Sequence, residues 1–244
     1  MRYVAAVPIL LFSLMIFAGA QARPPGSPDA ARLDCGAVPV RITGATAEEA
    51  ELACVGTADA VRFMAALGVD AGTDISIAVR SRVALVDGAR LAFPVLGQFH
   101  PSIDRVAVAS LATQRAMAAD HEVFRMPFDV AQFREVVAHE VAHVIAERNF
   151  AMAKPSRLAH EYIAYVVQME TMDPARRARM LARYDVEPFG SEDAINPILH
   201  LFAPDVFAIK AYLFYRAQPD ARAHLRRVLA RDLSGASASL ELLY

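Results

Sequence analysis

The chain has 244 residues but only two cysteines, Cys35 and Cys54, so it lacks the three or four thiolates of a cysteine-based metal site. It also lacks an excess of basic residues, because 25 Lys and Arg stand against 27 Asp and Glu, which argues against a nucleic acid as its partner. Outside residues 4–20, the sequence has no apolar run long enough to span a bilayer, and it has no internal repeats or low-complexity tracts. With 55% hydrophobic residues, it can bury the core of one large domain or two small ones.

The first 22 residues have the pattern of a secretory signal peptide. Arg2 precedes the apolar run 4–20, and the small residues Ala20 and Ala22 form a cleavage site. An uncleaved membrane anchor is the alternative, but the run is at the short end of spanning length. No cysteine stands at the cleavage point, so a lipid anchor is not expected. Cleavage after Ala22 leaves 24 basic and 27 acidic residues, and we expect a periplasmic or secreted protein without stable membrane insertion.

The two cysteines are expected to form a disulfide. In an exported chain, a pair of cysteines normally oxidises, whereas two buried thiols are the less favoured interpretation. Closing a loop between Cys35 and Cys54 would stabilise the fold by about 3 kcal/mol. The bridge would tie a helix that carries Cys54 to the N-terminal strand.

Strand patterns dominate the sequence up to residue 110. Residues 23–34 are rich in proline and are expected to form a flexible N-terminal segment. Residues 38–43 can form a strand that Pro39 places at an edge or at its beginning. A capping box that starts at Thr46 predicts a helix that ends at Gly68. Further strands are predicted over 74–80, 82–86, 90–96 and 105–110, with a tight turn at Asp87 and Gly88 between the second and third of these.

Only helix patterns follow. A short helix is predicted over 111–120, and a long helix over 130–148 with Asp129 as its N-cap. Further helices are predicted over 155–172 and 174–184, and two more should begin at Asp205 and Asp220. The core stripe of the long helix is expected to consist of Phe133, Val137, Val141 and Val144. An aromatic cluster is interpreted as core rather than as a substrate subsite: Phe202, Phe207, Tyr212, Phe214 and Tyr215.

The long helix contains the run HEVAH, with His139, Glu140 and His143. Residues four apart on a helix lie one turn above each other, with Cβ atoms about 5 to 6 Å apart, so both imidazoles can reach one metal ion. Glu140 lies beside this pair, where a carboxylate can act on a metal-bound water instead of ligating the metal. The spacing therefore predicts a zinc site with Glu140 as its base.

The motif and the order of elements resemble the zincin metallopeptidases. The resemblance implies an α+β fold in which a small mixed sheet covers an active-site helix and a helical subdomain forms the other wall of the cleft. One domain over 35–244 would then contain a part with the sheet and the active-site helix, 35–150, and a helical part, 151–244. The resemblance is closest over residues 129–170, and it points to an exported bacterial family with a gluzincin core.

A third zinc ligand is needed beside the two histidines, because catalytic zinc sites usually have three protein ligands and an open position. The metzincin pattern is excluded, since Ala146 and Asn149 occupy its glycine and third-histidine positions. Gluzincins use a Glu on a following helix, and Glu161 lies 18 residues after His143. The resemblance therefore implies His139, His143 and Glu161 as ligands of Zn²⁺. The neighbouring His160 is a rival ligand that cannot share the direction of Glu161.

The surroundings of the metal are less well defined by the sequence. Gluzincins of the thermolysin type have an Asp four residues after the ligand Glu, which orients a ligand histidine, but Tyr165 stands there. Its hydroxyl could replace that Asp, or the partner could come from elsewhere. The histidines outside the motif and its neighbour, His100, His121, His200 and His224, are interpreted as surface or structural residues. The group that stabilises an oxyanion is left open among His200, His224, Tyr212 and Tyr215.

These residues favour a zinc-dependent peptidase that acts on a peptide or protein substrate. Glu140 would take a proton from the metal-bound water and return it to the leaving amine. The strand 105–110 could bind an extended peptide by strand addition. The alternatives are a non-catalytic exported protein that binds zinc or a partner on the same scaffold, and a helical domain in which the motif is accidental. The sequence leaves the oligomeric state and the cleavage specificity open.

Overall fold

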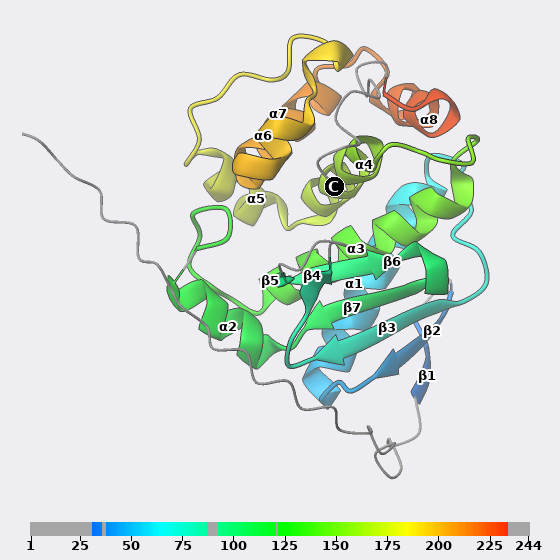
Figure 1. Ribbon diagram of the computed structural model, residues 1–244, viewed down its shortest axis with the longest axis vertical. Helices are drawn as coiled ribbons and strands as arrows, with labels where there is room; N and C mark the ends of the chain where they lie inside the picture. Colours follow the sequence, from blue (N-terminus) through cyan, green and yellow to red (C-terminus); the bar gives the residue numbers. More distant parts are fainter. Residues whose placement is uncertain (1–30, 36–37, 87–91, 121, 234–244) are drawn as a thin grey trace, which may run out of the picture.

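The computed structural model describes residues 31–35, 38–86, 92–120 and 122–233, and Figure 1 shows how its helices and strands are arranged. The predicted signal peptide, residues 23–30, the predicted turn at Asp87 and Gly88, and His121 lie outside the described residues. The fold is α+β, with a small mixed sheet on one side and helices on the other. The predicted fold class is therefore confirmed at this level.

The main sheet has five strands in the order β1-β2-β3-β7-β6. They are β1 (Ala31–Asp34), β2 (Pro39–Thr43), β3 (Ile75–Arg80), β7 (Arg105–Ala109) and β6 (Gly97–His100). The strands β2, β3 and β7 run parallel, while β1 and β6 are antiparallel to their neighbours at the two ends of the sheet. A separate antiparallel pair consists of β4 (Ala84–Val86) and β5 (Ala92–Pro94), as the hairpin pattern predicted.

One expectation about the strands is wrong. Residues 31–34 are not part of a flexible segment, because they form β1, in which Leu33 pairs with Val40 of β2. The strand β2 lies inside the sheet, and Pro39 is its first residue, which is one of the two positions that the sequence predicts. The sequence pattern also missed β6, a four-residue strand without a β-branched residue that is held by its pairing with β7.

Eight helices lie in the described residues, with bounds close to those predicted. They are α1 (Ala47–Ala65), α2 (Leu111–Asp120), α3 (Ala131–Asn149), α4 (Arg157–Thr171), α5 (Pro174–Leu181), α6 (Pro197–Phe202), α7 (Pro204–Arg216) and α8 (Ala221–Arg231). The short α6 was not predicted. The helix α3 packs against α1 and, on another side, against α4, and it contacts β6 and β7 of the sheet. Figure 1 shows α4 to α8 gathered on the side of α3 away from the sheet.

Side chains cap several of these helices as the sequence predicts. The Thr46 hydroxyl accepts the Glu49 N–H, and the Glu49 carboxylate accepts the Thr46 N–H, which completes the capping box of α1. The side chains of Ser156, Asp173 and Asp220 cap α4, α5 and α8, each by accepting the backbone N–H of the residue three positions later.

The N-termini of α3 and α7 depart from the prediction. The carboxylate of Asp129 accepts the Gln132 N–H at 3.3 Å, but Val130 is the residue that directly precedes α3. The helix α7 begins at Pro204, so Asp205 lies in its first turn and does not cap it. The Asp205 carboxylate instead accepts a hydrogen bond from the Tyr184 hydroxyl at 2.9 Å. Asp205 therefore links α7 to the segment after α5.

The disulfide between Cys35 and Cys54 is present, with Cα atoms 5.0 Å apart. It joins the segment after β1 to the middle of α1, as expected from the cysteine count. Because the covalent link spans 19 positions, it restricts the unfolded chain around β1 and β2. The link is compatible with an exported protein.

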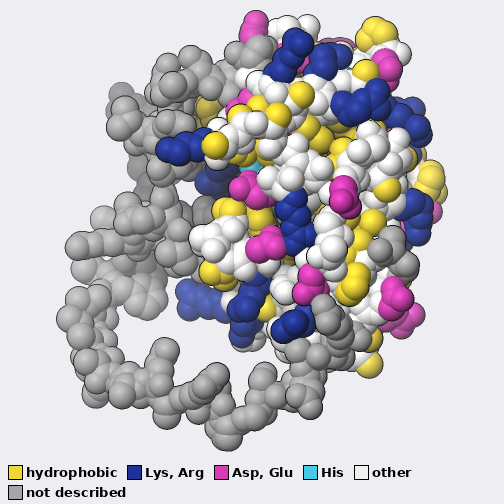
Figure 2. Space-filling model, turned by 90° about the vertical axis from the view of Figure 1, so that its right-hand side faces the viewer, with side chains coloured by type: hydrophobic (Ala, Val, Ile, Leu, Met, Phe, Trp, Pro, Cys, Tyr) yellow, Lys and Arg dark blue, Asp and Glu magenta, His cyan; other side chains and the backbone are white. Residues whose placement is uncertain are grey.

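None of the described helices combines the length and the apolar composition that a bilayer crossing requires. On the face shown in Figure 2, basic and acidic side chains are interspersed between apolar ones. Most of the predicted aromatic cluster is buried, with Phe207 and Tyr212 at 0% and 5% exposure. Phe202 is the exception at 80%, because it lies at the end of the short α6, on the outside of the molecule.

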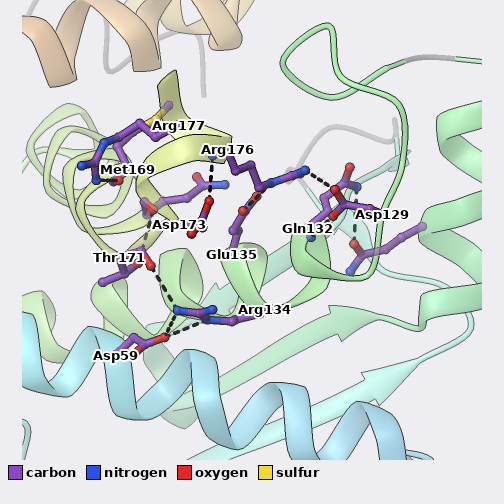
Figure 3. Close-up of polar contacts among 12 residues, drawn as sticks. Asp59, Asp129, Gln132, Arg134, Glu135, Met169, Thr171, Asp173, Arg176 and Arg177 are labelled. Atoms are coloured by element: carbon purple, nitrogen blue, oxygen red, sulfur yellow. Dashed lines mark hydrogen bonds and ion pairs between the residues drawn. The ribbon is translucent and has the colours of Figure 1, made fainter. Parts of the chain in front are cut away.

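A group of ion pairs fixes the first half of α3 against its neighbours (Figure 3). The Arg176 guanidinium of α5 donates to the Glu135 carboxylate of α3 at 2.6 Å and also binds Asp129. Burial raises the pKa of Glu135 to about 7, although Arg176 acts in the opposite direction. On another side of the helix, Arg134 donates to Asp59 of α1 at 2.8 Å and to the Thr171 carbonyl of α4. We call Arg176, Glu135 and Asp129 the α3–α5 clamp.

Candidate metal centre

The two motif histidines face the same point. His139 and His143 lie one turn apart on α3, and their Nε2 atoms are 3.1 Å from each other. Their side chains are about one tenth exposed, so they lie in a mostly buried position that water reaches only in part. The predicted core stripe Phe133, Val137, Val141 and Val144 is buried as well. Neighbouring elements therefore cover α3 on nearly all sides, and the side chains of His139 and His143 point into the protein interior.

Glu161 of α4 completes the group. Its Oε2 atom lies 3.6 Å from His139 Nε2 and 3.9 Å from His143 Nε2. Zinc ligands at about 2.0–2.1 Å and tetrahedral angles are separated from each other by about 3.3–3.4 Å. The three separations, 3.1, 3.6 and 3.9 Å, lie close to that value, so small side-chain movements would suffice. Two imidazoles and one carboxylate therefore fit a zinc ion in chemistry and in spacing.

His160, the rival ligand, points elsewhere. Its Nε2 atom lies 3.0 Å from a carboxylate oxygen of Glu147 in α3, and its ring lies 4.7 Å from the Phe150 ring. Because adjacent helical residues point about 100° apart, His160 and Glu161 could not both face the histidine pair. The structure places Glu161 in the group and His160 beside it.

The partner of His139 is a residue that the sequence reasoning missed. The side-chain oxygen of Gln168 lies 3.1 Å from His139 Nδ1, and because a carbonyl oxygen only accepts, Nδ1 carries the proton in this contact. That tautomer leaves the lone pair of Nε2 for a metal. Tyr165 contributes its ring instead, which packs against the His139 ring at 4.6 Å between centroids. Gln168 lies seven residues after Glu161, on the same face of α4, and this spacing was a usable signal.

Glu140 lies beside the group, against the end strand of the sheet. It is 6% exposed, and the nearby backbone N–H of Phe99 in β6 favours the charged form of its carboxylate. Burial raises the pKa of Glu140 to about 7, while the charge of His139 acts in the opposite direction. A carboxylate with a pKa near neutrality can both accept and release a proton at physiological pH.

The charges of the three candidate ligands suit a cation. Burial raises the pKa of Glu161, but hydrogen bonding to His139 and His200 outweighs it, and the pKa lies well below the usual value. Burial lowers the pKa of His143 to about 3, so its imidazole is neutral. Burial also acts to lower the pKa of His139, yet Glu161 and Glu140 raise it overall. A divalent cation bound here would take the place of the proton on His139, which the charges of Glu161 and Glu140 stabilise.

Of the four residues considered for oxyanion stabilisation, only His200 contacts the group. Its Nε2 atom, carried by α6, lies 3.5 Å from Glu161 Oε2. His224 is fully buried elsewhere and binds the Tyr162 hydroxyl at 2.9 Å, while Tyr212 packs under Arg177. Tyr215 lies on the side of α7 near Glu170. His200 therefore lies against a candidate ligand, and its ring also packs against Tyr165 and Phe207. The buried His224 fits its interpretation as a structural residue.

We expect Gln168→Ala to weaken zinc binding by about 10 to 100-fold, because the His139 ring loses the partner that fixes its tautomer. Competition with a chromophoric zinc chelator measures this change on the purified protein. Gln218→Ala is a matched control, since the Gln218 side-chain amide donates to the Phe214 carbonyl at the end of α7. An unchanged affinity in Gln168→Ala would show that the contact does not orient a metal ligand.

Comparison with known proteins gives a family but no further relative. The family model described as a family of unknown function, DUF6639, matches residues 40–237, and the chain belongs to this family. The match includes most of the sheet, the candidate metal centre and the C-terminal helices. No curated protein and no solved structure matches the chain.

Proposed function

We propose that this protein is an exported, zinc-dependent metallopeptidase with a gluzincin-like site. The observation that carries the proposal is the convergence of His139, His143 and Glu161 from α3 and α4, with the buried carboxylate of Glu140 beside them. The order of a mixed sheet, an active-site helix and a helical part supports a zincin-like relationship. The disulfide between Cys35 and Cys54 supports export.

His139, His143 and Glu161 would hold the zinc ion. Bound there, zinc lowers the pKa of a coordinated water to about 7 and polarises a carbonyl group. Glu140 accepts the proton of the attacking water and then delivers it to the leaving amine, which its pKa of about 7 favours. Gln168 keeps the proton of His139 on Nδ1. His200 is positioned at Glu161 to donate a hydrogen bond to the developing oxyanion.

The strand that would bind an extended substrate is not the one expected. Strand addition to β7 is excluded, because β3 and β6 pair with its two sides. In the described part of the sheet, β6 is the end strand on the side of α3, and it contacts that helix. A peptide that adds a strand to this sheet near Glu140 would therefore pair with β6.

A second function is a non-catalytic protein that binds zinc or a partner on the same scaffold. One observation favours it: the residue that binds His139 Nδ1 is the neutral Gln168, not a carboxylate. A neutral partner supports the basicity of the ligand histidine less than an anion does. Such a protein would bind zinc without Glu140-dependent cleavage of any peptide.

Zinc analysis tests the metal site. The chain is expressed with residues 1–22, so that export and processing occur in the cell, and elemental analysis of the purified protein should give about one zinc per chain. Glu161→Ala and His139→Ala should each lose most of this zinc, because two ligands hold it poorly. His100→Ala is the control, as His100 ends β6 and does not belong to the group.

Incubation with a peptide library then separates the two functions. Cleavage that disappears with a chelator and returns with zinc supports the peptidase. Stoichiometric zinc without any cleavage would favour the non-catalytic alternative. If neither wild type nor reconstituted protein binds zinc, the metal site itself is ruled out.

A further inference from the structure

Gly97 occupies the place in β6 where a side chain would meet the proposed base. A Cβ atom added to Gly97 would lie 2.5 Å from Oε1, 2.6 Å from Cγ and 2.9 Å from Cδ of Glu140. Real Cβ atoms essentially never approach other atoms so closely, so one side would have to move. Glu140 is 6% exposed and packed in the middle of α3, and three of its side-chain atoms are involved. It therefore has little room to withdraw.

The hydrogen-bond pattern of the sheet shows why Glu140 lies there. The Ala109 N–H of β7 donates to the Leu96 carbonyl at 2.8 Å, so Leu96 and Ala109 form a hydrogen-bonded pair. In an antiparallel ladder such pairs alternate, and Gly97 and Phe99 therefore direct their backbone groups away from β7. The N–H of Phe99 therefore points to this free side, where it acts on the nearby Glu140 carboxylate and lowers its pKa.

We propose that Gly97 is a positioning residue for Glu140: because it has no side chain, the Glu140 side chain can lie directly against β6, which keeps its carboxylate beside the metal ligands. This inference rests on the proposed function, since the position of Glu140 matters for its role as base. The strand β6 would then both bind the substrate and support Glu140.

A double-mutant cycle in thermal stability tests the contact independently of activity. Gly97→Ala should lower Tm by about 3 to 8 °C, as expected for overpacking in a chain of this size. In the background of Glu140→Ala, the same substitution should change Tm by less than about 1 °C, because the atoms that it meets are gone. Additive effects of the two substitutions would overturn the inference. Gly190→Ala is the matched control, since nothing lies within 4 Å of its added Cβ, and it should leave Tm and activity unchanged.

The kinetics of Gly97→Ala test the positioning role. We expect kcat to fall by about 10²-fold, with KM and zinc content close to wild type, because the base is displaced by about 1 Å while the ligands stay. A wild-type kcat in this variant would overturn the proposal. Failure of the proposed function would give a different result. If the effects of the two substitutions on Tm are non-additive but the wild type is inactive, the contact between Gly97 and Glu140 is supported and the peptidase function is not.

Discussion

Replacing Glu140 with glutamine should abolish peptide hydrolysis while about one zinc per chain remains. Glutamine keeps the shape of the side chain, and its carbonyl oxygen can still lie near the Phe99 N–H. The amide cannot take up a proton from water, however, so general base catalysis is lost. This contribution typically amounts to 10² to 10⁴-fold, and we expect kcat/KM to fall by at least about 10²-fold on the peptide that the wild type cleaves best.

The measurement compares variants at equal zinc occupancy. Glu51→Gln is the control, because Glu51 lies on the exposed side of α1, and it should keep full activity. A wild-type rate in Glu140→Gln would exclude Glu140 as the base even if zinc is bound. Loss of zinc in this variant would instead assign Glu140 to metal binding, although its carboxylate lies outside the group formed by His139, His143 and Glu161.

Local signals in the sequence predicted the helix starts well. The capping box at Thr46 depends on two residues three positions apart, and the caps at Ser156 and Asp173 depend on equally short contacts. Asp205 is also an aspartate at a predicted helix start. However, Pro204 already opens α7, and the Asp205 carboxylate accepts a hydrogen bond from the Tyr184 hydroxyl. Pro204 is a local signal for the first helical turn, whereas the contact between Asp205 and Tyr184 is a tertiary one that the local sequence does not show.

The strand order could not be derived in the same way. Residues 105–109 were recognised as a strand, but their interior position in the sheet depends on β6, which precedes them and pairs with them antiparallel across a single turn of 3-10 helix over Pro101–Ile103. The four residues of β6 include a glycine and no β-branched side chain. Pairing with β7 fixes their conformation, so the sequence pattern did not reveal β6. The strand 105–110 was therefore predicted as the substrate-binding strand in its place.

The candidate ligands were accessible to sequence reasoning because each comes from a long helix with a clear start. His139 and His143 share one helix face, and Glu161 lies in the first turns of the next helix, so a short connection suffices to bring them together. Gln168 follows on the same face of α4 and could have been found by spacing. His200 could not, because it belongs to the six-residue α6, whose position depends on packing against α7.

The second large effect concerns stability, and it arises in the α3–α5 clamp. Arg176→Met should destabilise the protein by about 3–5 kcal/mol, because it leaves the Glu135 carboxylate buried without its cationic partner. Both side chains are nearly inaccessible, at 6% and 5% exposure, so water cannot replace the guanidinium. Chemical denaturation measures the change. Arg179→Met is the matched control on the same helix, where the side chain is exposed, and it should cost less than about 0.5 kcal/mol.

The pH dependence of this destabilisation should identify the buried Glu135 carboxyl group as its cause. Its pKa in the folded protein is about 7, above the ordinary value of 4.5, so between these pH values the folded state binds the proton more readily than the unfolded chain. Its contribution to stability therefore declines as the pH rises through this window. Without Arg176 the carboxyl group should remain protonated to still higher pH, and the cost of Arg176→Met should be smaller at pH 5 than at pH 8.

A double substitution separates the buried charge from the loss of packing. Glu135→Leu combined with Arg176→Met replaces the ion pair by apolar side chains, and such replacements are often neutral or stabilising. The double variant should therefore be more stable than Arg176→Met alone, most clearly at pH 8. If it is less stable, the arginine stabilises α3 mainly through Asp129 and its own packing, and not through Glu135. Because Glu135 and Arg176 do not belong to the group formed by His139, His143 and Glu161, the same double variant should keep the zinc affinity of the wild type once α3 is folded.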